Sequence, residues 1–426
     1  MLDMSMFREK SEVLRKDHDK RKIPHDNIDE VIRLDNEWKQ ARYEVDQLRK
    51  SRNEAARGIA AAKKTGDTEA VNKIMIEVSS IGDKIEELSK MADDFLENRD
   101  SIRMRVPNIL HESVPVGEDD QKNTLHSLHG EKNDFSFEAK NHNEIIENNG
   151  WVDLARAAKI TGSRFYFMQG DLARLEMALQ NYTTNFLINK NYTLVQPPLM
   201  MNKEAYEGVT DLGDFETVMY GIEPDKFYLI ATSEHPLTAM RMDEIIEPSE
   251  LPIKLVGVSQ CFRREVGAHG LSDRGIWRVH QFTKIEQIII CKPEDSWSHH
   301  EDLLNNATEL WDSLGLHYRV VNICTGDMGT VASKKYDLEA WLPGVGEYKE
   351  VVSCSNCTDY QANRLRMRYR TSEGNSAVHT LNSTAVATSR ALVAILEQYQ
   401  TEDGRIMIPE ALRSYMGDQE FLSPLS

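Results

Sequence analysis

The sequence is 426 residues long, 40% hydrophobic and 28% charged, with a formal net charge of −18. This length accommodates about two domains, and the negative charge argues against a general nucleic-acid coat, so any RNA would need a local basic surface. The N-terminus has no signal-peptide pattern, no apolar run approaches the ~20 residues that span a bilayer, and five cysteines, an odd number, favour a reducing cytoplasm.

A long helical hairpin is predicted over about residues 31–105. Apolar residues recur alternately three and four apart over 34–62 and again over 71–102, on either side of a short turn at Gly66. Two heptad-patterned helices joined in this way form an antiparallel coiled coil. At 1.5 Å per residue the arm would be roughly 45–50 Å long. We place it in an N-terminal domain of residues 1–110.

The first arm helix has a basic character that the rest of the chain lacks. Residues 37–64 contain eight basic and four acidic side chains, a balance of +4. Such a stripe fits a phosphate backbone, although charges that flank a coiled coil can also serve only to solvate and pair its helices. Our candidates for RNA contact are Arg49, Lys50 and Arg57.

Residues 106–124 contain two prolines and several acids and are predicted to be a linker to a second domain, 111–426. In that domain, an apolar stripe marks a helix before TLVQPPL (193–199): Leu172, Leu175, Leu179, Tyr182 and Phe186. The stripe fits either a subunit interface or a helix that is buried within one subunit.

Residues 261–286 are predicted to form strand, polar loop and strand. With a period of two from Trp277, one face of the second strand carries Arg278, Phe282 and Glu286, with Arg263 on the strand before. Arginine binds phosphoryl oxygens bidentately and an aromatic ring can stack on a purine. A hairpin with one solvated polar face would show the same alternation.

Further candidates follow in chain order. Glu350 and Ser353 are hard oxygen ligands suited to Mg²⁺, with Glu339 upstream. Cys354 and Cys357 form a CxxC, but zinc would need a second pair, so we interpret both as packing residues and expect no zinc. Arg390 begins an amphipathic helix, where an arginine is often simply solvated.

Four segments of the chain resemble, in order, the signature of seryl-tRNA synthetases, which are class II aminoacyl-tRNA synthetases. They are TSEHP (232–236), CFRREVGAHG…RGIWRVHQFTKIEQ (261–287, motif 2), YKEVVSCSNCTDYQANR (348–364) and LNSTAVATSRALVAILEQYQ (381–400, motif 3). Residues 172–199 resemble motif 1, the dimer interface. The resemblance implies an α+β fold: an N-terminal two-helix arm that holds tRNA, and an antiparallel β-sheet catalytic domain flanked by helices.

The resemblance also implies the chemistry. The carboxylate of L-serine attacks the α-phosphate of ATP to give seryl-adenylate, and serine then passes to tRNA(Ser), or to tRNA(Sec) where that tRNA is present. By the same resemblance we expect ATP as substrate, Mg²⁺ as cofactor, a cytoplasmic homodimer and no membrane association.

The resemblance also assigns roles to individual residues of this sequence, position by position. Catalysis is assigned to Arg263, Arg278 and Arg390, and Mg²⁺ to Glu350 and Ser353. Serine binding is assigned to Thr232, Ser233, Glu234, Arg263, Glu286, Asn382 and Thr384. ATP binding is assigned to Arg263, Arg264, Glu265, Arg278, Val279, Phe282, Glu350, Val351, Val352, Ser353 and Arg390.

The chain departs from the commonest pattern at a few positions. Asn-Ser-Thr-Ala in motif 3 resembles archaeal and eukaryotic members, Asn363 stands where arginine is usual, and Leu271 and Ser272 replace a more polar pair. Two other functions stay open: an amino acid:carrier protein ligase, and a catalytically silent RNA-binding paralogue. The intact arm argues against the first, and the retention of Arg263, Glu286 and Arg390 argues against the second.

Overall fold

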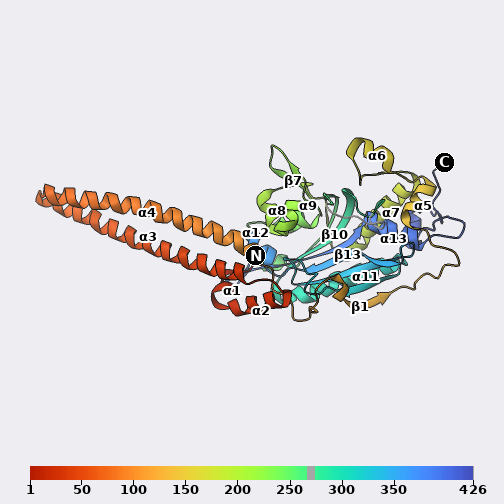
Figure 1. Cartoon of the computed structure of the whole chain (residues 1–426), viewed down its shortest axis with the longest axis horizontal. Coiled ribbons are helices and arrows are strands. Elements are labelled where there is room, and N and C mark those ends of the chain that lie inside the picture. The colour runs from red at the N-terminus through yellow and green to blue at the C-terminus, as the bar shows by residue number, and fades with distance from the viewer. Residues whose placement is uncertain (266–273, 426) are drawn as a thin grey trace. The chain divides into compact units, whose positions relative to one another are not determined.

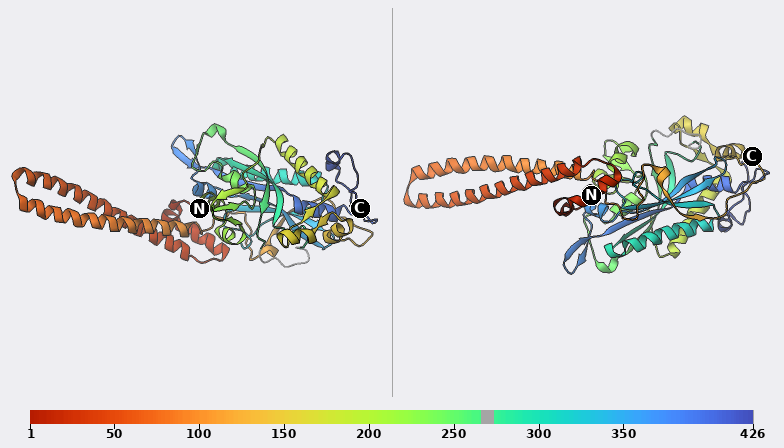
Figure 2. Two further views of the ribbon diagram at one scale, coloured as in Figure 1. Left: turned by 90° about the horizontal axis from the view of Figure 1, so that it is seen from above. Right: turned by 60° about the horizontal axis from the view of Figure 1, so that its bottom comes forward.

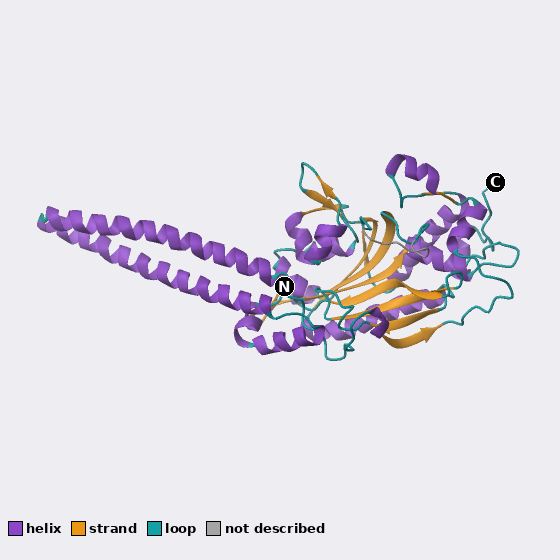
Figure 3. Ribbon diagram, in the orientation of Figure 1, coloured by secondary structure: helices purple, strands orange, loops and turns teal. Residues whose placement is uncertain are grey.

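The computed structural model describes residues 1–265 and 274–425, which form two compact units, Leu2–Pro107 and Asn108–Ser426, with Met1 grouped with the second (Figure 1). The first unit contains helices, and the second contains both helices and strands (Figure 3). In the described part of the chain, no helix is both long enough and apolar enough to cross a membrane.

The N-terminal unit contains the predicted hairpin. Its helices are α1 (Met4–Glu9), α2 (Ser11–Arg21), α3 (Asp26–Thr65) and α4 (Thr68–Arg103). Helices α3 and α4 lie side by side along their length (Figure 2). Gly66 ends α3 at φ +75°, a left-handed conformation that favours glycine, and the Asp67 side chain caps α4 by accepting a hydrogen bond from the Ala70 amide at 3.0 Å.

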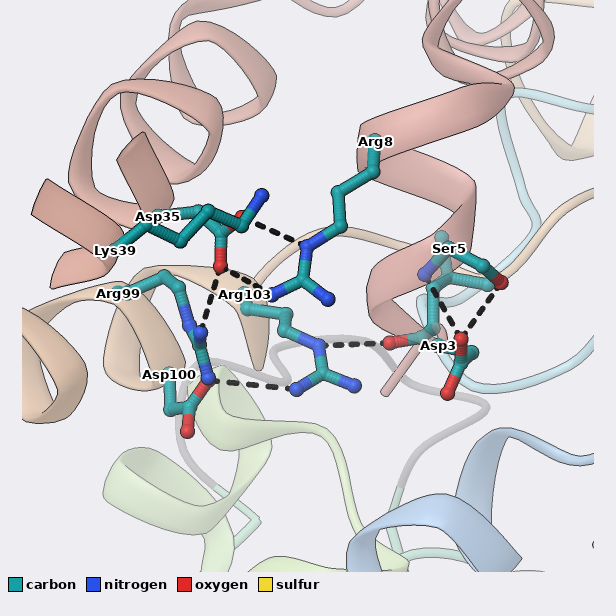
Figure 4. A network of polar contacts seen from close by, with 9 residues as sticks. Asp3, Ser5, Arg8, Asp35, Lys39, Arg99, Asp100 and Arg103 are labelled. Carbon is teal, nitrogen blue, oxygen red and sulfur yellow. Dashed lines mark hydrogen bonds and ion pairs between the residues drawn. The ribbon is translucent and has the colours of Figure 1, made fainter. Parts of the chain in front are cut away.

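A buried carboxylate ties the base of the arm together. Asp35 of α3 is 2% exposed and binds Arg8 of α1 at 2.7 Å, Lys39 of α3 at 2.7 Å and Arg99 of α4 at 2.8 Å (Figure 4). Burial alone would raise the pKa of Asp35, but the hydrogen bonds from Arg8, Lys39 and Arg99 outweigh it and lower that pKa well below its usual value. Three helices are therefore joined through one anion.

The C-terminal unit is built on one large sheet. Eight strands lie in the order β1 (Thr124–His129), β11 (Tyr318–Asn322), β12 (Lys334–Leu342), β13 (Glu347–Asn356), β16 (His379–Ala387), β10 (Gln281–Cys291), β9 (Ile253–Phe262) and β4 (Thr193–Val195). All neighbouring pairs are antiparallel except β4 with β9. The predicted α+β class with an antiparallel sheet is confirmed, with this one parallel pair added.

Helices α7 (Gly170–Asn189), α11 (Ser296–Ser313) and α13 (Thr388–Gln398) pack against one face of the sheet. Ile285 and Ile289 of β10 point into this core. Because side chains alternate along a strand, Lys284 and Glu286 point to the opposite face. On α7, Leu172, Leu175 and Leu179 are fully buried in the single chain, so the intramolecular core accounts for much of the predicted stripe.

Shorter elements complete the unit. The helices are α5 (His142–Asn149), α6 (Leu154–Thr161), α8 (Lys203–Val209), α9 (Leu212–Val218), α10 (Glu234–Ala239), α12 (Tyr360–Leu365) and α14 (Glu410–Arg413). The strands are β2 (Val152–Asp153), β3 (Phe167–Met168), β5 (Met200–Asn202), β6 (Gly221–Ile222), β7 (Phe227–Leu229), β8 (Ile245–Ile246), β14 (Arg368–Thr371) and β15 (Gly374–Ala377).

Two expectations about local structure need correction. The predicted linker is partly core, because Leu110 and Val114 are buried against Val321 and Ile323 of the sheet region. The second strand of the 261–286 hairpin begins only at Gln281, because residues 274–277 form a turn with Gly275 at φ +67°. The alternation predicted from Trp277 therefore fails before the strand begins.

Replacing Asp35 by alanine should loosen the base of the arm. Arg99 is 7% exposed at the side chain, and removal of one partner from a buried pair costs about 3–5 kcal/mol. The contribution of the carboxylate should be present above its unfolded pKa of about 3.9 and be lost as the pH falls toward its lower folded pKa. Hydrogen exchange of the α3 and α4 amides near Asp35 measures both effects.

Glu30→Ala is the matched control, since Glu30 forms an exposed pair with Arg33 three residues along α3. Such surface pairs contribute about 0–1 kcal/mol. Equal protection in Asp35→Ala and Glu30→Ala would contradict a structural role for the network.

Candidate active site

A cavity of about 540 Å³ opens on the face of the sheet opposite helices α7, α11 and α13. Its floor is formed by β10, β13 and β16, and its walls by the segments 209–211, 231–235 and 329–332. The cavity therefore combines parts of the chain that lie more than 170 residues apart in sequence.

Most of the predicted site residues line this cavity. They are Thr232, Glu234, Arg263, Glu265, Arg278, Val279, Phe282, Glu350, Val351, Ser353, Asn382, Thr384 and Arg390. Among the described residues, four predicted ones do not line it: Ser233, Arg264, Glu286 and Val352. Leu271 and Ser272 lie outside the described residues.

Three of those four residues, Ser233, Glu286 and Val352, are buried, whereas Arg264 is exposed. Ser233 is buried and donates to the Gly257 carbonyl at 3.3 Å, and Val352 packs in the main core. The backbone amide of Arg264 donates to the Val218 carbonyl at 2.9 Å. Val218 itself lines the cavity, so Arg264 fixes part of its wall through the backbone.

Glu286 is a buried carboxylate directly beneath the cavity surface. It is 1% exposed, and its Oε1 accepts hydrogen bonds from Thr232 at 3.1 Å and from Thr384 at 3.2 Å. Lys284, two residues earlier on β10, forms an ion pair with it. Both threonines and the lysine line the cavity, so they cover the carboxylate and compensate its charge.

Glu234 provides a second carboxylate that does reach the cavity. Its Oε1 accepts hydrogen bonds from Asn382 at 2.9 Å and from Gln361 at 3.4 Å. Burial, together with the nearby negative charge of Glu286, raises the pKa of Glu234 to about 7.

The other end of the cavity combines guanidinium groups with aromatic rings. The Arg263 guanidinium lies 5.5 Å from the ring centre of Phe282, and that of Arg390 lies 5.3 Å from the ring of Trp277. Arg390 also donates to the backbone carbonyl of Glu350 at 2.7 Å. Cations here attract anionic oxygen atoms, and the rings offer flat apolar surface.

The turn before β10 brings residues of both predicted faces into the cavity. Trp277, Arg278 and Val279 all line it, although strict alternation would have placed Arg278 on the opposite side from its neighbours. The Arg278 guanidinium lies 3.5 Å from a carboxylate oxygen of Glu265. The assignment of Arg278 to this cavity therefore does not depend on the strand that was predicted around it.

Two oxygen ligands suited to a hard cation face the cavity from β13. The Glu350 side chain is about half exposed there. Partial burial alone would raise its pKa, but the positive charges of Arg390 and Lys335 outweigh this effect and lower it. Ser353 lies opposite Asp337 of β12, whose Oδ1 is buried with no hydrogen-bond partner among the described residues. Carboxylate and hydroxyl oxygens fit Mg²⁺.

Two other candidates from the sequence have different surroundings. Glu339 does not line the cavity in the described part of the chain, and forms an ion pair with Arg319 instead. Cys354 packs in the core, whereas Cys357 lines the cavity with its sulfur 3.7 Å from the Asn382 amide nitrogen. Within residues 1–265 and 274–425, no three His, Cys, Asp or Glu side chains gather as a metal site.

The sequence analysis assigned no role to several lining residues. Lys284 shares the strand face predicted for Phe282 and Glu286, and its period-two spacing from Glu286 could have revealed the pair. Lys335 and the segment 329–332 carry no local signal, because only strand pairing and loop packing bring them to the cavity. The candidates for RNA contact, Arg49, Lys50 and Arg57, are exposed on α3 of the other unit.

Comparison with known proteins agrees with this geometry. The family "Seryl-tRNA synthetase N-terminal domain" matches residues 1–110, and "tRNA synthetase class II core domain (G, H, P, S and T)" matches residues 218–399. A serine–tRNA ligase of Methanocorpusculum labreanum is 52% identical over 99% of this chain and 100% of its own length.

Solved structures lead to the same family. The seryl-tRNA synthetase of Pyrococcus horikoshii, solved with ATP, superposes with a TM-score of 0.93 at 42% identity over the full length of both chains. The cytoplasmic serine–tRNA ligase of Naegleria fowleri, solved with AMP, has a TM-score of 0.88 at 35% identity and covers 100% of this chain and 99% of its own.

The chain belongs to the seryl-tRNA synthetase family. The resemblance in the sequence, the archaeal and eukaryotic affinity and the prediction of a serine–tRNA ligase are confirmed. The residue-by-residue roles in this seryl-tRNA synthetase site stay predictions, because the comparisons concern whole chains and domains.

The carboxyl group of Glu234 should titrate near pH 7 in the free protein. Replacing Glu286 by glutamine should shift this titration to lower pH, because it removes a neighbouring negative charge and leaves Lys284 without its anion. Carboxyl-carbon NMR of protein labelled at glutamate, assigned with Glu234→Gln, measures the shift. Glu339→Gln should leave the titration unchanged, and an equal shift in both variants would contradict the coupling.

Proposed function

We propose that this cavity activates L-serine with ATP and that the arm presents tRNA(Ser) for aminoacylation. The observation that carries the proposal is the division of the cavity. One end offers Arg263, Arg390 and Phe282 to a nucleotide, and the other offers Glu234 with the hydroxyls of Thr232 and Thr384 to a small ammonium- and hydroxyl-bearing substrate.

We assign the contacts with ATP to the charged and aromatic side chains at the nucleotide end of the cavity. Phe282 would stack on adenine, while Glu265 would accept a hydrogen bond from the adenine amino group. Arg278 would hold the outer phosphates, and Arg390 would approach the nucleotide from the opposite side. A relative with 42% identity over its full length was solved with ATP, which supports ATP as the nucleotide that binds here.

For serine, two carboxylates would divide the work. Glu234 reaches the cavity, and Glu286 becomes available when the ammonium group of the substrate takes the place of Lys284. Thr232 and Thr384 are already fixed by their hydrogen bonds to Glu286. Asn382, held 2.9 Å from Glu234, would complete the pocket.

The chemical step needs no side-chain nucleophile. The serine carboxylate attacks the α-phosphorus, the bond to the β-phosphate oxygen breaks, and pyrophosphate leaves. Arg263 would bridge the serine carboxylate and the α-phosphate, so that the two reactants are aligned and the developing charge is stabilised. Glu350 and Ser353 would hold Mg²⁺, which when bound neutralises phosphate charge and orients the phosphates.

We infer a homodimer formed through motif 1. Met177 of α7 is 64% exposed and Leu194 of the edge strand β4 is 44% exposed. Of the α7 stripe, Leu172, Leu175 and Leu179 are buried, whereas Tyr182 and Phe186 are only partly buried. Exposed apolar side chains beside an unpaired strand edge are suited to a second copy of the chain.

The proposed aminoacylation includes the charging of tRNA(Sec) wherever that tRNA exists.

Glu286→Ala should remove serine activation while ATP still binds. Loss of a buried charged partner costs about 2–5 kcal/mol, or roughly 30- to 4,000-fold in kcat/KM for serine. Serine-dependent ATP–pyrophosphate exchange measures this, with Glu339→Ala as a control outside the cavity. An unchanged kcat/KM would show that Glu286 does not bind serine.

Replacing residues 37–102 by a short Gly/Ser linker should leave serine activation intact and abolish charging of tRNA(Ser). Neutralising Arg49, Lys50 or Arg57 singly should weaken tRNA binding and reduce its salt dependence by up to about one counterion per lost contact. Lys84→Ala, an exposed basic residue on the acidic helix α4, is the matched control.

Wild-type charging by the armless protein would make the arm a spacer. Serine activation with no charging of any tRNA by the full chain would instead favour a ligase for another carrier, and absence of both activities would favour a silent RNA-binding paralogue.

A further inference from the structure

Asn108 directly follows the N-terminal unit in sequence and lies outside any helix or strand, yet it forms several hydrogen bonds to other parts of the chain. It is 2% exposed. Its amide nitrogen donates to the backbone carbonyls of Val331 at 2.9 Å and Cys357 at 2.8 Å, and to the Thr358 hydroxyl at 3.0 Å. Its backbone amide donates to the Thr330 carbonyl at 2.8 Å.

Three of these partners are walls of the cavity. Thr330, Val331 and Cys357 all line it. Thr330 and Val331 come shortly before β12 and Cys357 directly after β13, and the pairing of these two strands extends only to Lys334 and Asn356, with one further bond from the Ser333 amide to the Asn356 carbonyl at 2.8 Å. The two wall segments lie just beyond that pairing. Asn108 therefore joins two separate parts of the wall through one side chain and one backbone amide. Its own Oδ1 accepts from the Ile109 amide at 2.9 Å, which fixes the side-chain orientation.

The turn that Asn108 holds is strained. Thr358 has φ +49°, in the left-handed region that β-branched residues rarely adopt. Besides Asn108, its hydroxyl donates to the Cys357 carbonyl at 2.8 Å and its carbonyl accepts from the Thr380 amide at 3.0 Å. Such strain persists only where the surroundings over-determine the conformation.

The strained turn places a part of the predicted serine pocket. The Cys357 sulfur lies 3.7 Å from the amide nitrogen of Asn382, and the same nitrogen donates to Glu234 at 2.9 Å. A shift of Cys357 would therefore disturb the hydrogen bond that orients Glu234. The nucleotide end, around Phe282 and Arg390, has no such connection to Asn108 among the contacts of the described residues.

We propose that Asn108 is a positioning residue for amino acid binding: it holds the 330–331 wall and the left-handed Thr358 turn together and thereby sets the place of Asn382 and Glu234. This inference rests on the proposed binding of serine at that end of the cavity. Asn108 itself touches no predicted substrate position and acts through Cys357 and Thr358.

The first test compares the two substrates in ATP–pyrophosphate exchange. Asn108→Ala should raise the KM for serine about tenfold or more, with the KM for ATP within about twofold of wild type. Asn363→Ala is the matched control, because Asn363 is also buried and bonds Asp359 at 2.8 Å on the adjacent helix α12. Equal rises in both KM values, or an equal effect of Asn363→Ala, would overturn the proposal.

The second test uses the strain itself, in case Asn108→Ala does not fold. Thr358→Gly and Thr358→Val both remove the hydroxyl, but only glycine relieves the left-handed strain, whereas valine keeps it. The valine variant should raise the KM for serine and the glycine variant should not, and Thr358→Gly should restore serine affinity to Asn108→Ala. Equal serine KM values for the two Thr358 variants would refute the role of the turn.

These outcomes are distinct from failure of the proposed function. If the wild-type chain exchanges pyrophosphate without depending on serine, the proposed function is wrong before any variant is compared. If wild-type exchange depends on serine and the variants behave alike, only the role of Asn108 is wrong.

Discussion

The burial of the Glu286 carboxylate is the constraint on which the C-terminal unit depends. A lone carboxylate at 1% exposure would be strongly unfavourable, so it needs compensation from its surroundings. Lys284 supplies a positive charge, and Thr232 and Thr384 supply hydrogen bonds from two other parts of the chain. The register of β10 against β16, which places Glu286 opposite Thr384, is therefore tied to the electrostatics of the cavity.

The same strand must satisfy a core and a cavity at once. Ile285 and Ile289 face the helices, while Phe282 and Lys284 face the cavity. A shift of one residue would bury the charged side chains in the core and expose the isoleucines, so alternation itself fixes the register. This explains why a period-two pattern in a single strand carries so much functional information.

The sequence was informative wherever a pattern is local. Heptad spacing predicted both arm helices, because a two-helix coiled coil is stabilised by neighbours a few residues apart. Alternation along the sequence predicted which residues of β10 face the cavity. It did not predict the turn at Gly275, where a left-handed φ interrupts the extended chain shortly before Arg278, which also lines the cavity. The roles of Lys335 and Asn108 had no local signal in the sequence. Lys335 reaches the cavity only through strand pairing, and Asn108 bonds residues more than 200 positions away along the chain.

The proposed serine pocket also explains how a small substrate could be selected. Thr232 and Thr384 already donate to Glu286, so a bound substrate must offer polar groups that match this fixed arrangement. A site built to hydrogen-bond a hydroxyl rejects an analogue that lacks it by leaving buried polar groups unpaired, a far larger penalty than a missing methylene in an apolar pocket. The penalty is large only if the groups cannot relax, and the hydrogen bonds that the Asn108 and Thr358 side chains donate to the Cys357 carbonyl restrict that relaxation. In the proposed pocket, rigidity of the wall would therefore contribute to specificity as well as to stability.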